Sequence, residues 1–584
     1  MTVADLELRG HRALWQVAAP IPSELRAALN GESVMLAHLL YCRGYRSLSE
    51  IQAFLRGDLI SHDPFLLPDM EAAVERIARA ADQSERVAVY GDFDCDGITS
   101  TAAIVETLTG LGLSPIAYIP TREEGHGLHP EALARLADRN VFLLVTADCG
   151  ITCLEEVQVA KGMGMDVIVT DHHEARADGS LPTCPTISPT RHDSLYPFRS
   201  LSGAGVAYKL AQALRARLPQ APNPDDLLDL IALGTIADVV PLRDENRALV
   251  IRGMSRLRDT RRPGLLALYE VAGVDRHRID PVSVGFYLAP RINAANRMAS
   301  PQLAYDLVTA IDGAVAAGLA ERLSDFNQQR QALVAETFDS MAATLGEPER
   351  IASDVSAGTQ PPVLVVVGEW PSGISGLLAS KLVELYGLPA FVGSVAGDGI
   401  VSVSARGVAG VHIDEMLEAC EAAFPGGLFL GYGGHARAGG FRVAQDKLAV
   451  AQQTLEEYAR GTIAVDPKGS ILTIDAEVRF AQLTAGAGRQ LLSLAPFGMD
   501  FGEPLFLTRK VELKRIVRLK SGSHGRLSLM QGTTRLEGVL FNAPPAVFQL
   551  QPGTHLDVVF HFGLNEWNGQ VRPEITLRDW RVSA

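Results

Sequence analysis

The chain has 584 residues, of which 47% are apolar and 21% charged, and its formal net charge at pH 7 is −15. This length predicts several domains with sizeable cores. No apolar run approaches the length of a membrane span, and the acidic start MTVADLELRG is not that of a signal peptide. The six cysteines form no CxxC pair, so we expect no disulfide framework, no structural zinc site, no membrane partner and a cytoplasmic location.

Residues 1–70 have Pro and Gly between short stretches such as SELRAALNG and SLSEIQAFLRG, a pattern that predicts short helices. They carry no candidate chemistry. The Ala-rich segment 71–83 predicts an amphipathic helix, which leads into the apolar run Val87–Tyr90.

Three aspartates at alternate positions, Asp92, Asp94 and Asp96, follow this run in the stretch VAVYGDFDCDG. Carboxylates this close repel one another unless a cation lies among them. Because all the donors are oxygen, Mg²⁺ or Mn²⁺ is favoured over a soft metal. An EF-hand calcium loop is excluded, because the twelfth position counted from Asp92 is Ala103 rather than a bidentate Glu. A solvated acidic turn would lack the strand and the helix on its two sides.

Two more apolar runs end in residue types that bind metals. Asp148 follows Val141–Val145, and the triplet Asp171–His173 follows Val167–Val169. Three apolar strands separated by helices predict a parallel sheet that is covered on both faces. Since ligands gather at the carboxyl ends of such strands, we expect these residues to meet at one edge, together with Asp238 between the apolar runs of ALGTIADVVPL. Each alone could be a helix cap or a buried polar group; their shared position suits two Mn²⁺ or Mg²⁺ ions.

Further along, PRINAANRM supplies Arg291, Asn293 and Arg297. Arginine pairs bidentately with phosphate, although either arginine could equally be a surface residue or part of an interface salt bridge. A long helical stretch then covers residues 301–347 and is predicted to connect two domains.

A second α/β unit is predicted from the strand Val363–Val367, followed by the turn PSGISG and the helix LLASKLVELYG. Backbone N–H groups of SGISG could bind an anion, although this signal is weak alone. Candidate anion-binding residues also end the next strand and lie in GYGGHARAGG: Ser404, Arg406, Gly433, Gly434 and His435. Glycines let the backbone approach a phosphate closely and a histidine can donate to it. A tight turn with a capped histidine is the structural alternative.

After a linker at 461–470 that contains Pro467 and Gly469, alternating runs such as RLSLMQ and LDVVFHF predict a small antiparallel β-barrel. Residues 505–540 hold eight Lys or Arg against two Glu, although the whole chain is acidic. This local reversal suits an OB-type fold that binds a single-stranded backbone, with His524 as a base contact; a solvated face is the alternative. The basic candidates are Arg515, Arg518, Lys520 and Arg526.

The DFDCDG box, the Asp148 box and the DHH triplet at 171–173 resemble the DHH phosphoesterase superfamily. PRINAANRM at 290–298 and GYGGHARAGGF at 431–441 resemble the RecJ-type single-stranded-DNA exonucleases in particular. The similarity extends over most of the chain. Two positions depart from the family pattern: Pro371 stands where His is usual and Asn296 where Gly is usual.

The resemblance implies roles for the candidate residues. It makes Asp94, Asp96, Asp148, His172 and Asp238 the metal ligands, with Asp148 as the bridge between two ions. It makes Asp92 and Asp171 supporting acids of the catalytic centre, and His173 a residue that faces the substrate phosphate.

The resemblance also implies the organisation of the chain: an α/β protein with a helical segment (1–70), a DHH metal domain (71–245), a helical connector (246–350), a smaller DHHA1-type domain (351–463) and an OB-type barrel (464–584). The implied activity is two-metal hydrolysis of single-stranded DNA from a phosphorylated 5′ end to the 3′ end, releasing mononucleotides in DNA repair and recombination. Implied partners are a single-strand-binding protein and a RecQ-type helicase.

Two alternatives remain at this point. One is a DHH phosphodiesterase that acts on short oligonucleotides or cyclic dinucleotides, but its members generally lack a C-terminal barrel. The other is a non-catalytic nucleic-acid-binding replisome scaffold, whose mark is the loss of metal ligands, and here every matched position is filled. A dinucleotide-dependent enzyme is disfavoured, because no G-x-G-x-x-G follows the first strand.

Overall fold

The structure of the protein is a computed structural model, which describes residues 8–9, 13–29, 33–176, 178–395, 399–424, 426–463, 471–519, 522, 524–567 and 570–583. Lys520 and the linker residues Pro467 and Gly469 lie outside the described residues. The chain divides into two compact units, Ile60–Val465 and a second that joins Met1–Leu59 to Asp466–Ala584. None of the helices among the described residues combines the length and apolar character that a membrane span requires.

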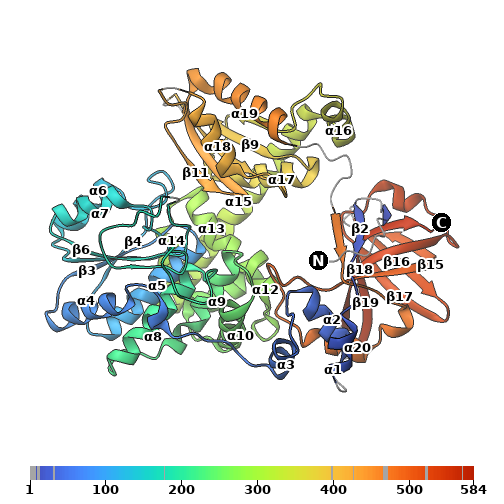
Figure 1. Ribbon diagram of the computed structural model, residues 1–584, viewed down its shortest axis with the longest axis horizontal. Coiled ribbons are helices and arrows are strands. Elements are labelled where there is room, and N and C mark those ends of the chain that lie inside the picture. The colour runs from blue at the N-terminus through green and yellow to red at the C-terminus, as the bar shows by residue number, and fades with distance from the viewer. Residues whose placement is uncertain are drawn as a thin grey trace. The chain divides into compact units, whose positions relative to one another are not determined.

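The first unit opens with an α/β domain (Figure 1). Its elements are η1 (Pro64–Leu66), α4 (Met70–Asp82), β3 (Val87–Tyr90), α5 (Cys95–Gly110), β4 (Ile116–Tyr118), α6 (Pro130–Asp138), β5 (Leu143–Thr146), α7 (Leu154–Gly162), β6 (Asp166–Thr170), β7 (Thr186–Ile187), α8 (Gly203–Arg217), η2 (Pro224–Leu227), α9 (Leu228–Ala237) and α10 (Asp244–Asp259).

The five strands form a parallel sheet in the order β4-β3-β5-β6-β7. Because successive side chains of a strand point to opposite faces, Val87 and Val89 of β3 pack with α4, α5 and α8, whereas Ala88 and Tyr90 pack with α6 and α7. Figure 1 shows these helices on the two sides of the sheet. The predicted parallel sheet, covered on both faces by helices, is confirmed.

A helical segment follows. Its elements are α11 (Pro263–Ala272), η3 (Arg276–Arg278), α12 (Pro281–Ser283), the π-helical turn η4 (Val284–Leu288), α13 (Ala289–Met298), α14 (Gln302–Val308), α15 (Gly313–Leu345) and α16 (Pro348–Ser356). Helix α15 runs without a break for 33 residues, and its Val334 and Met341 pack against α17 of the next domain.

The second α/β domain has the elements β8 (Leu364–Gly368), α17 (Ser372–Tyr386), β9 (Ala390–Val395), β10 (Ile400–Arg406), α18 (Ile413–Ala422), β11 (Gly431–His435), β12 (Ala438–Ala444), η5 (Gln445–Lys447) and α19 (Leu448–Thr462). Its sheet has the order β11-β12-β10-β9-β8, and only the β8–β9 pair is parallel. The predicted turn PSGISG is wrong: α17 begins at Ser372, so Gly373 and Gly376 lie in its first turns.

The second unit contains β1 (Leu8–Arg9), β2 (Leu14–Val17), α1 (Ser23–Ala28), α2 (Val34–Cys42), α3 (Leu48–Arg56), β13 (Ile471–Ile474), β14 (Ala476–Glu477), η6 (Phe480–Gln482), α20 (Ala485–Leu492), β15 (Leu505–Arg518), β16 (Gly525–Gln531), β17 (Thr534–Leu540), η7 (Pro545–Gln549), β18 (His555–Trp567) and β19 (Gln570–Val582). Strands β15, β16, β17, β19 and β18 pair in turn, and β18 pairs with β15, which closes the barrel.

The N-terminal segment is built into this barrel domain. Strand β2 pairs in parallel with β13, and the fully buried Trp15 donates its indole N–H to Asp579 Oδ2 at 2.8 Å. Arg43 of α2 pairs with Asp475 at 3.0 Å. The sequence predicts the short helices here but gives no sign of β2, because its pairing partner lies more than 450 residues away.

Candidate metal centre and arginine cluster

The carboxyl ends of the parallel strands bring the predicted acidic residues and histidines together. Asp92 and Asp94 follow β3, Asp148 follows β5, and Asp171 to His173 follow β6. Potential ligand atoms of three sets lie within 4.8 Å of one another: Asp92, Asp94 and Asp148; Asp96, His172 and Asp238; and Asp148, His172 and His173. The three sets overlap, because Asp148 belongs to the first and the third and His172 to the second and the third.

The prediction for the local structure around Asp238 is wrong in one respect. This residue does not follow a strand but is the C-cap of helix α9, and the VVPL segment after it forms no strand. Because α9 is apolar over almost its whole surface, its sequence shows neither the period of a helix nor that of a strand. Periodicity therefore cannot tell which of the two it forms. The helix still carries Asp238 to the sheet edge, where Asp238 Oδ2 lies 3.5 Å from His172 Nε2.

Two helix N-termini orient the carboxylates of the DFDCDG loop. Asp94 is the N-cap of α5, and its Oδ1 accepts the N–H groups of Asp96 and Gly97 at 3.0 Å each. Asp96 accepts the N–H groups of Gly203 and Ala204, at 2.7 and 2.9 Å, at the start of α8. Helix N-termini favour negative charge, and they fix the directions of both carboxylates before any ion binds.

Asp148 adopts a left-handed backbone conformation, with φ of +64°. This conformation is uncommon for a residue other than glycine and is typically retained at functional sites. Asp148 stands two residues after the end of strand β5, and its Oδ1 lies 3.1 Å from His172 Nε2.

Glycines make room for this packing. A Cβ atom on Gly203 would lie 2.4 Å from Asp148 Oδ1, and one on Gly234 would lie 2.5 Å from Asp96 Oδ1. Neither contact is possible for real atoms. Sequence reasoning missed both positions, because neither glycine stands in a recognisable motif.

Burial and mutual repulsion disfavour the charged state of these acids. Burial and then Asp94 raise the pKa of Asp96 to about 7. Burial and then Asp96 raise the pKa of Asp148 well above its usual range, and the same two causes act on the pKa of Asp238. A nearby cation would stabilise the charged form of these carboxylates and oppose the upward shifts of their pKa values.

The two histidines of the DHH triplet have opposite electrostatics. Burial and then His173 lower the pKa of His172 to about 3, so that its imidazole is neutral and can act as a ligand. Burial also acts to lower the pKa of His173, but Asp171, which lies 2.7 Å from its Nδ1, outweighs this effect and the pKa of His173 rises to about 10. The carboxylate of Asp171 therefore favours the protonated form of His173.

The donor set fits divalent metal ions. Four buried atoms at the centre have no hydrogen-bond partner in the described structure: Asp92 Oδ1, Asp148 Oδ1, Asp238 Oδ2 and His172 Nε2. Orphaned buried acceptors cost free energy unless something binds them. Carboxylate oxygens with one imidazole are a donor set for Mn²⁺ or Mg²⁺.

His126 is a residue at this centre that sequence reasoning missed. Its Nδ1 lies 3.3 Å from Asp92 Oδ1, and its ring centroid lies 4.6 Å from that of His173. Both neighbours, Gly125 and Gly127, have φ of +93°. The sequence Gly-His-Gly could have pointed to this histidine. Glycines on both sides of one residue favour positive φ, and hence a special backbone conformation there.

Four arginines gather beside the metal centre. Burial and then the guanidinium groups of Arg122, Arg330 and Arg406 lower the pKa of Arg297 to about 9. Burial lowers the pKa of Arg122, and the negative charges of Asp92 and Asp94 oppose this shift. The guanidinium carbon of Arg122 lies 5.5 Å from the ring centroid of Phe93, the residue between these two aspartates. The Nε atoms of Arg297 and Arg330 are buried without a hydrogen-bond partner. Guanidinium groups gathered at this density form a site for an anion such as phosphate.

Two members of this arginine cluster were predicted and two were not. Arg297 donates to Gly373 O at 2.6 Å, and Arg406 lies at the end of β10. Arg122, on the loop after β4, and Arg330, in the middle of α15, lie outside the predicted motifs. Their contribution depends on tertiary packing that no local pattern reports.

The other predicted residues of PRINAANRM have different partners. Asn293 Oδ1 accepts the N–H of Cys95 at 2.8 Å, which ties α13 to the DFDCDG loop. Asn296, which departs from the family pattern, donates to Phe93 O at 2.9 Å and reinforces that tie. Arg291 instead donates to the carbonyls of Tyr287 and Val271 and to Ser324 Oγ.

The second α/β domain contributes the remaining predicted residues. His435, at the end of the exposed strand β11, stacks on His173 with ring centroids 6.1 Å apart. Gly433 and Gly434 precede it on β11, and Ser404 lies on β10 opposite Gly440. Pro371 is the N-cap of α17. His435 is thus the member of this group that the structure brings to the metal centre.

Three of the predicted basic residues of the barrel lie on one hairpin. Arg515 and Arg518 are on β15 and Arg526 is on β16, and all three are exposed. The guanidinium of Arg518 lies 3.9 Å from the ring centroid of Phe548. Phe541, 52% exposed, lies beside His524. Exposed aromatics among basic side chains suit a single-stranded nucleic acid.

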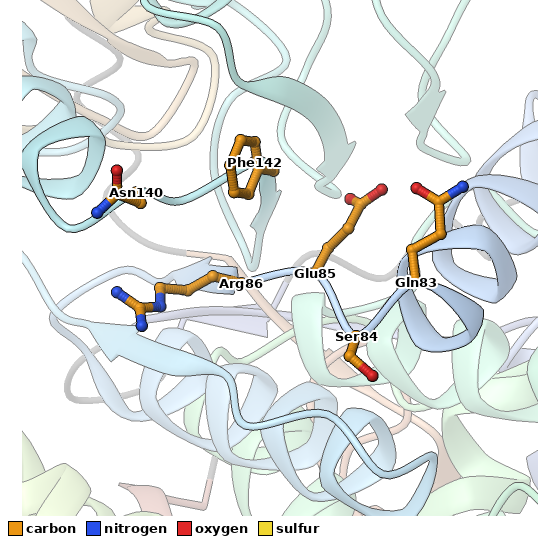
Figure 2. A pocket seen from close by; sticks show the side chains of 6 residues that line it. All are labelled: Gln83, Ser84, Glu85, Arg86, Asn140 and Phe142. Carbon is orange, nitrogen blue, oxygen red and sulfur yellow. The ribbon is translucent and has the colours of Figure 1, made fainter.

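A surface hollow at the opposite, amino-terminal edge of the parallel strands offers no comparable chemistry (Figure 2). Its charged side chains are already paired: Glu85 with Arg76, and Arg86 with the carbonyl of Arg139. Phe142, 53% exposed, lies at its rim.

Comparison with known proteins agrees with this geometry. Residues 86–235 match the DHH family, N-terminal domain, residues 360–461 match the DHHA1 domain, and residues 474–579 match the RecJ OB domain. Fold and site together define a DHH-type metal-dependent phosphoesterase with a DHHA1 domain and an OB barrel.

Whole-chain relatives narrow this class. The single-stranded-DNA-specific exonuclease RecJ of Escherichia coli is 34% identical over 96% of this chain and 96% of its own length. That of Bacillus subtilis is 33% identical over 97% of this chain and 71% of its own length. The crystal structure of RecJ from Thermus thermophilus in complex with Mn²⁺ has a TM-score of 0.81 and 28% identity, over 98% of this chain and 80% of that chain; the Mg²⁺ complex has a TM-score of 0.77. The chain belongs to the RecJ family.

Replacing Asp148 with asparagine tests the metal centre. Asparagine tolerates φ near +60°, so Asp148→Asn should fold, but it removes one of the crowded negative charges. We expect Mn²⁺-dependent hydrolysis to fall at least a hundredfold, and the metal-free variant to unfold a few degrees above the metal-free wild type. Calorimetry with and without Mn²⁺ measures the second effect. Asp178→Asn, at an exposed loop, is the control, and full Mn²⁺-dependent turnover by Asp148→Asn would contradict this account.

Adding one methyl group tests the glycine cradle. The Cβ of Gly203→Ala would collide with Asp148 Oδ1, whereas the Cβ of Gly318→Ala, in α15, has nothing within 4 Å. We expect Gly203→Ala to bind Mn²⁺ at least tenfold more weakly by titration calorimetry, and Gly318→Ala to bind it normally with unchanged or higher stability. Equal Mn²⁺ affinities of the two variants would refute the cradle.

Proposed function

We propose that the protein degrades single-stranded DNA from its 5′ end toward its 3′ end and releases mononucleotides by metal-dependent hydrolysis. Membership of the RecJ family makes it an exonuclease specific for single-stranded DNA. The arginine cluster beside the metal centre supports the binding of a terminal phosphate there, and the 5′-to-3′ direction is what the resemblance to RecJ-type exonucleases implies. A terminal phosphate held there would present the first phosphodiester bond to the metal donors.

Bound divalent ions would activate a water molecule and stabilise the charge on the phosphate. Asp94, Asp96, Asp148, His172 and Asp238 would hold them. Asp148 and His172 each belong to two donor sets, and of these two the carboxylate of Asp148 has two oxygens that could bridge a pair of ions, which supports its role as the bridge. Asp92 and Asp171 act as supporting acids: Asp171 accepts hydrogen bonds from the backbone N–H groups of His172 and His173, and from Ile151 N, so that the triplet is fixed.

His173 faces the substrate phosphate in this proposal. Its positive charge, held by Asp171 at 2.7 Å, lies between the imidazoles of His126 and His435. A cation here neutralises a phosphate oxygen in the ground state and more strongly as charge develops during hydrolysis. His435, across from it on β11, contributes from the second α/β domain.

The arginine cluster binds the 5′ phosphate. A phosphate monoester carries up to two charges and offers three acceptor oxygens, enough for Arg297, Arg406 and the two additional arginines. The glycines of α17 leave space for these side chains: a Cβ on Gly376 would lie 3.1 Å from Arg406 Nη2.

The OB barrel binds the strand through its own basic hairpin. Arg515, Arg518 and Arg526 would contact phosphates, and Phe541 would stack on bases. We also propose action in DNA repair and recombination, a cytoplasmic location, and a single-strand-binding protein and a RecQ-type helicase as partners, which the family resemblance supports.

The two alternative functions find less support. The barrel argues against a phosphodiesterase restricted to very short oligonucleotides or cyclic dinucleotides. An Asp or a His stands at every proposed metal-ligand position, and several of their donor atoms have no hydrogen-bond partner in the described structure. Both observations argue against a non-catalytic scaffold.

End-labelled substrates test the polarity. With Mn²⁺ present, single-stranded DNA labelled at the 5′ end should release labelled mononucleotide at once, while DNA labelled at the 3′ end should give a ladder of shortening products. The reverse pattern would overturn the proposed direction. Binding without cleavage would favour the scaffold, and cleavage of short oligomers alone would favour the phosphodiesterase.

Arginine variants test the phosphate site, and a second arginine on the helix of Arg330 serves as the control. Arg330 and the exposed Arg322 both lie on α15. We expect Arg330→Gln and Arg406→Gln to raise the KM for 5′-phosphorylated DNA about tenfold or more, since a hydrogen bond to a charged group contributes about 1.5–3 kcal/mol. The KM for 5′-hydroxyl DNA should change little, and Arg322→Gln should behave as wild type. If both arginine variants keep the wild-type preference for phosphorylated ends, the phosphate lies elsewhere.

A further inference from the structure

A buried asparagine joins two segments of the metal domain, residues 200–204 and residues 238–241. Asn246 is in the first turn of α10 and is fully buried. Its Nδ2 donates to Ser200 O at 2.6 Å and to Pro241 O at 3.1 Å. Its Oδ1 has no hydrogen-bond partner in the described structure. Because an unpaired buried oxygen costs free energy, this side chain is a poor choice for filling space alone.

The first of these segments orients two of the proposed metal ligands. The backbone of Leu201 hydrogen-bonds with the imidazole of His172. The N–H groups of Gly203 and Ala204 donate to the carboxylate of Asp96 at 2.7 and 2.9 Å. A displacement of this segment would therefore move the imidazole and the carboxylate together.

The second segment begins with a third ligand and is strained. Asp238, its first residue, belongs to the same donor set as Asp96 and His172. Val239 follows with a left-handed φ of +60°, and it is 56% exposed. For a β-branched residue this conformation is an outlier, and such strain persists only where the surrounding structure holds it. Contacts outside the segment must therefore keep it in place.

Helix α10 is a rigid base for these contacts. Glu245, the neighbour of Asn246, pairs with the fully buried Lys209 of α8 at 2.7 Å and accepts the N–H of His62 at 3.2 Å. Removing one partner of a buried ion pair is strongly destabilising, because the other charge is left unpaired. The start of α10 is thus fixed on α8, and from it Asn246 reaches both segments.

We propose that Asn246 is a positioning residue for one of the two metal ions. With one amide nitrogen it sets the distance between the segment that orients Asp96 and His172 and the segment that carries Asp238. This inference rests on the ligands assigned in the proposed function and goes beyond them, because Asn246 itself binds no metal. The donor set that contains Asp94 has no residue in either segment, so its ion should be bound independently of Asn246.

Titration calorimetry of the full chain with Mn²⁺ tests this role. Asn246→Ala removes both hydrogen bonds. The matched control is Thr260→Val, which removes a buried hydroxyl that donates to Asp229 Oδ2 at 2.7 Å, at the opposite end of α9 from Asp238. The metal-free unfolding temperature of each variant measures how far the fold itself is weakened. Asn246→Ser, which can donate only one hydrogen bond from its side chain, replaces Asn246→Ala if that variant does not fold.

We expect the wild type to bind two Mn²⁺ ions and Asn246→Ala to bind one of them about tenfold or more weakly, since residues that orient metal ligands contribute this much to affinity. The other ion should be bound as in the wild type. The Mn²⁺ concentration that gives half-maximal hydrolysis of single-stranded DNA should rise by a similar factor. Thr260→Val should lower the unfolding temperature but bind both ions normally.

A second substitution separates positioning from packing. Val239→Gly removes the backbone strain, because glycine adopts positive φ freely. The second segment can then keep its conformation with fewer contacts. Added to Asn246→Ala, Val239→Gly should raise the weakened Mn²⁺ affinity again by about fivefold or more, although it restores none of the lost packing.

Several results would overturn the proposal. Unchanged Mn²⁺ binding by Asn246→Ala would show that the residue positions no ligand. Equal weakening of both ions, the same loss in Thr260→Val, or no recovery on adding Val239→Gly would show a packing role alone. A wild type that binds a single ion would refute the two-metal centre of the proposed function and this inference with it, whereas a wild type that binds two ions leaves the proposed function standing whatever the Asn246 variants do.

Discussion

The repulsion among buried carboxylates at the end of the parallel sheet is the constraint on which the rest of the structure depends. Asp92, Asp94, Asp96, Asp148 and Asp238 meet with His172 in a small volume, and several of their donor atoms have no protein partner. Without cations this arrangement opposes folding. The surrounding fold holds the carboxylates in place: two helix N-termini bind Asp94 and Asp96, and glycines leave room for neighbouring side chains.

A cluster of positive charge lies beside these carboxylates. The four guanidinium groups around Arg297 also repel one another. The carboxylates suit cations and the arginines suit an anion, so the proposed phosphorylated strand with its metal ions would relieve both kinds of repulsion. Helix α15 carries Arg330 to this place and packs against the second α/β domain, so it joins the domain of His435 to the metal domain of His173.

Much of this centre is predictable because its determinants are local. An apolar strand followed by acidic residues places those residues at the sheet edge, whatever the rest of the chain does. Asp238 was found from its place between two apolar runs, yet its element was predicted wrongly, because an apolar helix has no distinctive period. Arg122, Arg330 and the glycine cradle at Gly203 and Gly234 escaped prediction, since their roles follow from packing between distant segments. The pairing of β2 with β13 was not predicted for the same reason.

The central claim is that the donor groups around Asp148 hold two divalent ions. Anomalous diffraction from crystals of the full chain soaked in Mn²⁺ tests it most directly. We expect two manganese peaks, both within coordination distance of Asp148, one shared with Asp94 and the other with His172. A single peak, or peaks that leave Asp148 uncoordinated, would contradict the two-metal account.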